Sequence, residues 1–198
     1  MSTDGGSSFG TAAAQIVVNI TDSANVVVRI NGSLFDTTGA TVLFEATSGT
    51  NVSPASIARN SANQLDVTFN AQALNADHDP YTVKVTNGSG LSATLADALL
   101  ADRAPAFTSA ADTTFTVYDT QRSTYSAACG ATDADGDTVT HTIQSGTLPA
   151  GASINSTTGA VTGANAVGTN TTSTFTVAAA TSNQTSTRQF NIAVQAPQ

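Results

Sequence analysis

The chain has 198 residues, of which 40% are hydrophobic and only 10% carry a charge. This hydrophobic content supports a packed core and argues against wholesale disorder, and the length suits one large domain or two of ordinary size. The net charge of -8, with six scattered Lys and Arg residues, argues against nucleic-acid binding, because a phosphate-binding face needs a clustered basic patch.

The start of the chain, MSTDGGSSFGTAAAQ, has neither the basic nor the apolar region of a secretory signal. No stretch approaches the roughly 18 apolar residues that a membrane helix requires. Cys129 is the single cysteine, so no internal disulfide can form. We therefore expect a protein that is made in the cytoplasm, folds without oxidation and has no transmembrane segment, with residues 1–13 as a polar arm.

Segments with the composition of β-strands follow this arm, separated by turn residues such as NG and NGSG. The predicted strands of the first half are 14–20, 25–30, 40–46, 64–69 and 81–86. Apolar and polar residues alternate in the last two of these strands, so one side of each strand is expected to face a core. The inward residues are Leu65, Val67, Phe69, Tyr81, Val83 and Val85.

The stretch LSATLADALLADRAP interrupts this pattern. Its apolar residues at helical spacing are Leu91, Leu95, Ala98 and Leu99. Either a short helix over 93–100 or a last strand fits the stretch, and we favour the strand because Pro105 forces extended backbone just before it. DRAP, at 102–105, is the best candidate for a domain boundary.

The second half resumes the β pattern. Its predicted strands are 114–119, 124–129, 138–143, 173–180 and 188–194. Clean alternation occurs in Phe175, Val177 and Ala179, and again in Phe190, Ile192 and Val194. Many short strands with regular turns indicate an all-β fold, here two tandem immunoglobulin-like β-sandwiches over 14–103 and 104–198.

Longer motifs in the second half carry a family resemblance. They are APAF, ATDADGDTVTHTI, SGTLPAGASINSTTGAVTG, TSTFTVAAAT and RQFNIAV. Residues 104–198 thereby resemble the "Putative Ig domain" family, which occurs in bacterial surface proteins and phage virion proteins and is related to cadherin-like and dystroglycan-type modules. Residues 26–101 resemble an IPT/TIG-type domain through VVVRINGSLFDTTGATVLFEA and DPYTVKVTNGSG, whereas 47–63 departs from that pattern.

The pairing of these two resemblances, without a signal peptide, is similar to structural proteins of tailed phages, including marine and cyanobacterial ones. It implies a non-enzymatic virion protein: a capsid decoration or head-fibre protein, or a component of the tail or its fibres. The implied partners are other virion proteins and further copies of the chain, with a host surface glycan as an additional ligand. The alternative is a carbohydrate- or cell-surface-binding adhesin module from a bacterial exported protein.

Three aspartates at alternate positions, Asp133, Asp135 and Asp137, raise the question of a calcium site. Their 1, 3, 5 spacing is that of an EF-hand loop, but Thr138 and Gln144 replace the glycine and the bidentate glutamate of that motif. A cadherin-type site would add Asp102 or Asp112 near the linker. The favoured interpretation is a turn before a strand, in which Asp side chains cap backbone N–H groups and Gly136 takes a positive φ.

Other chemistry is weakly indicated. His78 lies between two carboxylates in DHDP, but a metal site would need further ligands, and His141 is expected at the edge of the core. Cys129 is expected to be a buried apolar residue, although a nucleophile–base pair with His141 is conceivable. Glu45 is the only glutamate, so a glycosidase-like pair would need two aspartates. We predict no catalytic residues and no cofactor besides the calcium candidate.

Overall fold

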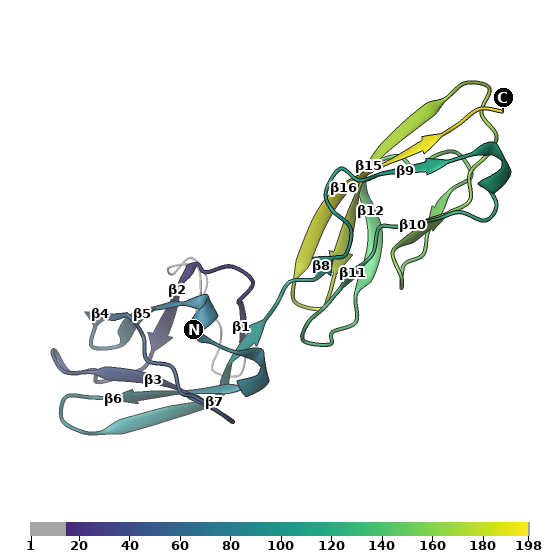
Figure 1. Ribbon diagram of the computed structural model, residues 1–198. Helices are drawn as coiled ribbons and strands as arrows, with labels where there is room; N and C mark the ends of the chain where they lie inside the picture. Colours follow the sequence, from purple (N-terminus) through teal and green to yellow (C-terminus); the bar gives the residue numbers. More distant parts are fainter. Residues whose placement is uncertain (1–14, 198) are drawn as a thin grey trace. The chain divides into compact units, whose positions relative to one another are not determined.

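The computed structural model describes residues 15–197, which form β-strands, loops and three short 3-10 helices (Figure 1). The polar arm predicted for residues 1–13 lies outside the described residues. The chain divides into two compact units, Met1–Arg103 and Ala104–Gln198, which are called unit 1 and unit 2. Each unit is described by itself.

Unit 1 consists of two sheets, with strand orders β1-β7-β6-β3 and β2-β5-β4. The strands are β1 (Ile16–Asn19), β2 (Asn25–Asn31), β3 (Thr41–Ala46), β4 (Ser56–Ser61), β5 (Gln64–Asn70), β6 (Tyr81–Thr86) and β7 (Ser92–Asp102). The 3-10 helices η1 (Ala71–Ala73) and η2 (Ala76–His78) connect β5 to β6. The first strand β1 runs parallel to the last strand β7, and the neighbouring pairs β7·β6 and β6·β3 are antiparallel.

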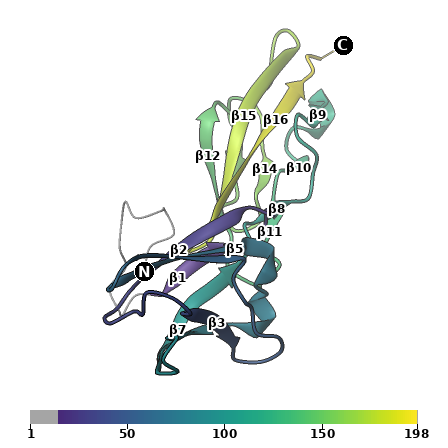
Figure 2. The same cartoon turned by 90° about the vertical axis from the view of Figure 1, so that its left-hand side faces the viewer.

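Unit 2 repeats this plan with the sheets β12-β15-β16-β9 and β10-β14-β13, and a short pair β11-β8. Its elements are β8 (Ala106–Phe107), β9 (Thr114–Val117), η3 (Asp119–Gln121), β10 (Ser126–Ala128), β11 (Ala131–Thr132), β12 (Thr140–Gly146), β13 (Ser153–Ile154), β14 (Ala160–Thr162), β15 (Thr171–Ala180) and β16 (Thr185–Val194). β9 again runs parallel to the last strand, β16. Figures 1 and 2 both show β15 and β16 side by side as the long final hairpin of the unit.

Strand order therefore identifies both units as immunoglobulin-like sandwiches, in which one sheet carries the last two strands and an early strand that runs parallel to the last one. The all-β prediction and the immunoglobulin-like prediction are confirmed. In unit 2, β15 and β16 pair over ten successive residues, from Thr171 with Val194 to Ala180 with Thr185.

The inward rows predicted from alternation are buried in the structure. Those of unit 1 are Leu65, Val67, Phe69, Tyr81, Val83 and Val85, and those of unit 2 are Phe175, Val177, Ala179, Phe190, Ile192 and Val194. Phe44 and Phe69, from facing sheets of unit 1, pack with their ring centroids 4.7 Å apart. Burying a side chain of this kind contributes about 1.5–3 kcal/mol, so these rows supply most of the driving force for each sandwich.

Residues 92–102 form the strand β7, so the favoured prediction of a strand is confirmed. A β-bulge explains why the apolar residues of this strand have helix-like spacing. Tyr81 pairs with Leu99 while Val83 pairs with Leu95, so β7 carries extra residues between these two pairs. Asp97 lies in this bulge with a φ of 50°. The bulge changes which residues face inward, so that Ala98 and Leu99 are both buried although they are consecutive.

Several strands carry no alternation and were not predicted. β4 is exposed along most of its length and lies at a sheet edge, so it needs no apolar face. The other unpredicted strands are β8, β11, β13 and β14, which have two or three residues each. The strand predicted over 138–143 begins two residues later, at Thr140, because the aspartate turn extends to that point.

Tyr81 ties the loop before β6 to the core of unit 1. Its side chain is fully buried, and burial raises the pKa of its phenol, so the hydroxyl remains a neutral hydrogen-bonding group. The hydroxyl accepts a hydrogen bond from the Asn75 backbone N–H at 2.9 Å and donates to the Asn75 carbonyl at 3.3 Å. A tyrosine at the start of this strand that bonds backbone a few residues upstream is the tyrosine corner of immunoglobulin-like folds.

We predict that Tyr81→Phe lowers the free energy of unfolding of unit 1 by about 1–2 kcal/mol, because the partly buried Asn75 N–H loses its acceptor. Urea unfolding of the full chain measures this change. Tyr118→Phe is the matched control: this tyrosine is 57% exposed, and we expect a change within about 0.5 kcal/mol. Equal effects of the two substitutions would contradict the prediction.

Candidate functional site

The loop end of unit 1 is organised by Asn87, in the turn between β6 and β7. The Asn87 side chain donates to the Leu34 carbonyl at 2.8 Å and accepts from the Asp36 N–H at 3.3 Å. The Asp36 carboxylate in return accepts from the Ser89 N–H at 2.8 Å. These bonds fix the loop after β2 against the β6–β7 turn, although the two are about 50 residues apart in the sequence.

Gly32 and Phe35 shape the inner side of the same loop. A Cβ on Gly32 would lie 2.6 Å from the Phe35 ring, so only glycine permits the ring to fold back onto the backbone. The Phe35 N–H donates to the Ala62 carbonyl at 2.8 Å, and the Phe35 carbonyl accepts from Arg59 at 3.1 Å. The loop is therefore held from β4 and β5 as well as from β6 and β7.

An apolar groove of about 460 Å³ lies at this end of unit 1. The residues that line it are Ile30, Asn31, Gly32, Ser33, Phe35, Val83, Val85, Ala93, Thr94 and Leu95. β1 pairs with β7 only over Leu99–Asp102 of that strand. The part of β7 that lines the groove thus lies beyond the reach of β1, which accounts for the opening.

Two leucines in the loops that adjoin the groove-lining segments are exposed. Leu34 is 79% exposed and Leu91 is 74% exposed. Asn87 bonds the carbonyls of both, through its side chain to Leu34 and through its backbone N–H to Leu91. Leu34 is also held at a φ of 59°, a conformation that residues with side chains rarely adopt. These bonds hold both exposed leucines in defined positions at the loop end of unit 1.

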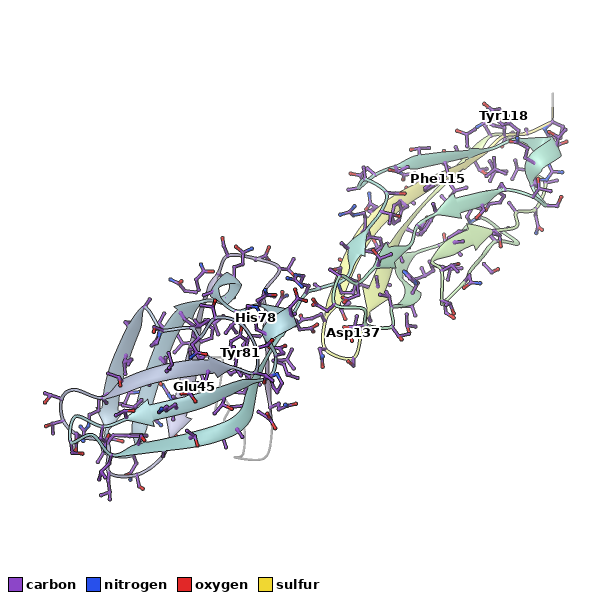
Figure 3. All side chains as sticks on the ribbon, turned by 60° about the horizontal axis from the view of Figure 1, so that its bottom comes forward. Glu45, His78, Tyr81, Phe115, Tyr118 and Asp137 are labelled. Carbon is purple, nitrogen blue, oxygen red and sulfur yellow. The ribbon has the colours of Figure 1, made fainter. Side chains whose placement is uncertain are left out.

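The aspartate stretch 131–141 forms a turn between β11 and β12. The Asp133 carboxylate accepts from the Asp135 N–H at 2.8 Å and from the Asp137 N–H at 3.4 Å, and Gly136 has a φ of 86°. The turn geometry expected from the sequence is therefore present. Figure 3 shows Asp137 and Tyr118 at opposite ends of unit 2.

The other aspartates considered for calcium, Asp102 and Asp112, lie in different units. Asp102 is buried at the end of β7, where its carbonyl accepts from the Ile20 N–H at 2.9 Å. The Asp112 carboxylate in unit 2 accepts from Gln189 at 2.9 Å. Within residues 15–197, no three His, Cys, Asp or Glu side chains are grouped so as to hold a metal ion.

The two histidines lie in different units. His78, labelled in Figure 3, lies at the end of η2. A Cβ on Gly49 would fall on its imidazole ring. His141 is 1% exposed, so it lies inside unit 2 and not at the edge of its core as expected. The backbone of β11 and of the turn after β13 supplies its hydrogen bonds, which brings the ring inward.

Cys129 lies in the core of unit 2, and Glu45 lies in an ion pair of unit 1. Burial raises the pKa of the Cys129 thiol to about 12, the opposite of what an activated nucleophile requires. Glu45 on β3 pairs with Lys84 on β6 at 3.3 Å on the sheet surface.

A second, smaller groove of about 410 Å³ lies at the end of unit 2. Tyr118, Asp119, Thr120, Asn170, Gln195, Ala196 and Pro197 line it. The Asn170 side chain accepts from the Ala196 N–H at 2.9 Å, and Asp119 forms an ion pair with Arg122. The exposed Tyr118 ring is the apolar surface of this groove.

Neither groove was predicted from the sequence. The sequence feature that could have pointed to the loop end of unit 1 is an apolar residue directly after a turn motif. Leu34 follows NGS, and Leu91 follows NGSG. Among the described residues, no helix is long and apolar enough to cross a membrane.

Comparison with known proteins supports the fold. Residues 104–195, slightly less than half of the chain, match the family described as "Putative Ig domain". Comparison with curated proteins gives no match.

Solved structures with similar folds include domains 3–5 of the extracellular part of Drosophila OTK, at 15% identity and a TM-score of 0.50, covering 91% of this chain and 59% of that one. A titin I67–I69 fragment covers 91% of this chain and 62% of its own at 12% identity and a TM-score of 0.45. The match with an endo-fucoidan hydrolase of glycoside hydrolase family 107 covers 94% of this chain and 28% of the hydrolase, at 19% identity and a TM-score of 0.34. The chain thus spans less than two thirds of each of these structures.

The chain is an immunoglobulin-like domain protein, a fold typical of non-enzymatic domains. The resemblance of unit 1 to IPT/TIG-type domains stays a prediction.

We predict that the thermal midpoint of the chain is the same in millimolar calcium and in chelator, because the Asp133 carboxylate already caps two N–H groups. Differential scanning calorimetry measures this midpoint. Asp133→Ala is expected to destabilise unit 2 by about 1 kcal/mol in both buffers, whereas Asp137→Ala, which retains both capped N–H groups, is expected to have less effect. A rise of several degrees with calcium that Asp133→Ala abolishes would overturn the turn interpretation.

Proposed function

We propose that this chain is a non-enzymatic structural protein of a tailed-phage particle, a capsid decoration or head-fibre protein or a component of the tail or its fibres. The carrying observation is the loop end of unit 1, where Leu34 and Leu91 are exposed in loops that adjoin the segments lining an apolar groove, and where Leu34 also lines an open hollow with Phe35 and Gly88. Such a surface suits contact with another protein better than it suits chemistry on a small molecule. The resemblance of the tandem domains to phage structural proteins supplies the biological setting.

Attachment through unit 1 would leave unit 2 to project from the particle. The contact surface is small, since it rests on two leucines and one groove, so a single copy would bind with modest affinity. Many copies on a repeating lattice would compensate for this through avidity, particularly if neighbouring copies also associate. The net charge of -8 disfavours non-specific association of the free protein before assembly.

We predict that mass spectrometry detects the chain in purified virions and that Leu34→Asp with Leu91→Asp reduces its copy number on the particle at least tenfold. Both leucines are largely exposed, so the double variant should keep the wild-type thermal midpoint within about 2 °C. Ser182→Asp with Asn183→Asp, in the exposed turn between β15 and β16, adds the same charge and should bind normally. Absence of the wild-type chain from the virion would refute this function.

The second candidate is a carbohydrate-binding module of a bacterial surface protein, and the groove at the end of unit 2 favours it. Tyr118 offers an exposed aromatic face, and Asn170 and Gln195 stand beside it. Aromatic faces pack against the apolar side of sugar rings while amides bond their hydroxyls.

For this candidate, we predict that a glycan array gives signals with the wild-type chain that fall at least tenfold in Tyr118→Ala. Tyr118→Phe keeps the ring and should retain most of the signal, which separates ring contact from hydroxyl contact. An array without signal would leave the virion proposal as the only one of the two in agreement with the data.

A further inference from the structure

The apolar groove of unit 1 lies at a side of the sandwich that no strand covers among the described residues. Ile30 and Asn31 belong to β2, the outer strand of the sheet β2-β5-β4. Ala93 and Leu95 belong to the part of β7 that lies beyond its pairing with β1. The groove therefore opens between two strand edges whose outward backbone groups have no strand partner within residues 15–197.

The lining of the groove is mostly apolar and carries no charge. Ile30, Phe35, Val83, Val85 and Leu95 supply large apolar side chains, and the other lining residues are small or neutral. An open strand edge beside an apolar slot suits an extended chain segment, which adds backbone hydrogen bonds along the edge and places an apolar side chain in the slot. The occupant should therefore combine an apolar residue with neighbours that are small and uncharged.

Unit 2 shows how the corresponding edge is covered in the same chain. There β8 pairs antiparallel with β11, with Phe107 opposite Ala131 (Figures 1 and 2). β11 follows directly after β10, the outer strand of the sheet β10-β14-β13. The Phe107 ring packs against the core of unit 2, and its centroid lies 5.8 Å from that of Phe190. A short strand with an inward phenylalanine thus closes this edge of unit 2.

The two units can be aligned on their parallel strands. β1 pairs with the last strand of unit 1 as β9 pairs with the last strand of unit 2, and each pairing covers four residues. Phe107 stands seven residues before Thr114, the first residue of β9. Seven residues before Ile16, the first residue of β1, the sequence has Phe9. Phe9 therefore holds the same place in the sequence relative to β1 as Phe107 holds relative to β9.

The direction of β1 also favours the segment that precedes it. β1 runs parallel to β7 with Ile16 opposite Leu99, so the chain arrives at β1 from the side of Ala93 and Leu95. An extended chain rises about 3.3 Å per residue, so the seven steps from Phe9 to Ile16 can span about 23 Å. The six steps of β7 from Leu99 back to Ala93 span about 20 Å. The chain before β1 is therefore long enough to bring Phe9 to the groove.

The sequence before β1 has the composition that the groove requires. Residues 9–14 read FGTAAA, which is one aromatic residue followed by glycine, threonine and three alanines. Asp4 is the only charged side chain in residues 1–14, and it lies five residues before Phe9.

We propose that residues 9–14 are the strand that occupies the groove of unit 1, with their backbone along the edge of β2 and Phe9 in the apolar slot. The N-terminal segment then completes unit 1 as β8 completes unit 2. Leu34 and Leu91 do not line the groove and remain exposed beside the added strand, so this inference does not rest on the proposed function.

The test compares the wild-type full chain with Phe9→Ser by NMR. In the wild type we expect nuclear Overhauser contacts between the Phe9 ring and the methyl groups of Val83, Val85 or Leu95. In urea, Phe9→Ser should raise the unfolding equilibrium constant of unit 1 at least about tenfold, because a buried aromatic side chain is lost, and leave unit 2 unchanged as the internal reference. A Phe9 ring without contacts to the groove, or an unchanged unfolding constant, would overturn the proposal.

The double variant Ser8→Phe with Phe9→Ser is the matched control. It keeps the composition of the segment but moves the ring by one position, which turns the side chain to the other face of a strand. We expect it to be as unstable as Phe9→Ser. Wild-type stability in the double variant would show that any nearby apolar residue suffices, and would refute the placement of Phe9.

Size-exclusion chromatography separates docking within one chain from exchange between two copies. Tethering raises the local concentration of the segment at its own groove, so we expect the wild type and Phe9→Ser to elute alike at low and at high protein concentration. A larger wild-type species that Phe9→Ser converts to the monomer would assign the groove to the segment of a second copy and overturn docking within the chain.

Discussion

Each sandwich depends on apolar contact between its two sheets, because the chain has a single cysteine and no disulfide can join them. In unit 1, Phe44 and Phe69 meet across the sheets. In unit 2, Phe175 and Phe190 from one sheet share a core with Ala127 and Val161 from the facing sheet, and Phe107 of β8 lies 5.8 Å from the Phe190 ring centroid. A domain of this size keeps only a few kcal/mol of net stability, so the few buried polar groups must be well paired.

The buried polar side chains lie where loops join the core. Tyr81 bonds the backbone of Asn75, and His141 bonds the backbone of Ala131 and Ser156. In both cases a side chain from the sheet with the last strands bonds backbone that lies outside that sheet. The two residues thus have the same role, since each fixes a loop or short strand to the core of its unit through backbone hydrogen bonds.

The parts of the fold that the sequence predicts are those controlled by local pattern. Alternation in 64–69 and 173–180 identified inward residues correctly, because burial of one strand face imposes a period of two. β4 escaped notice because an edge strand needs no apolar face, and β13 is too short for a period to emerge. The helical spacing in β7 came from a bulge, which depends on its pairing with β6 and not on β7 alone.

The candidate site was harder to predict, because it is made by contacts between distant loops. Nothing near Leu34 in the sequence shows that Asn87 will hold it, and nothing near Leu91 shows that the same residue holds both. The burial of His141 likewise depends on Gly130 and Gly159, which approach the ring from other parts of the chain. A motif can be identified from the sequence when its residues are close in the chain, as in the aspartate turn, but not when the fold brings distant residues together.

The polar side chains at the loop ends mainly bond backbone. Asp36, Asn87 and Asp133 each use side-chain oxygens to accept from backbone N–H groups, which fixes loops in place. What these bonds produce is a rigid loop end that displays Leu34 and Leu91, and rigid display lowers the entropy that a binding partner must overcome.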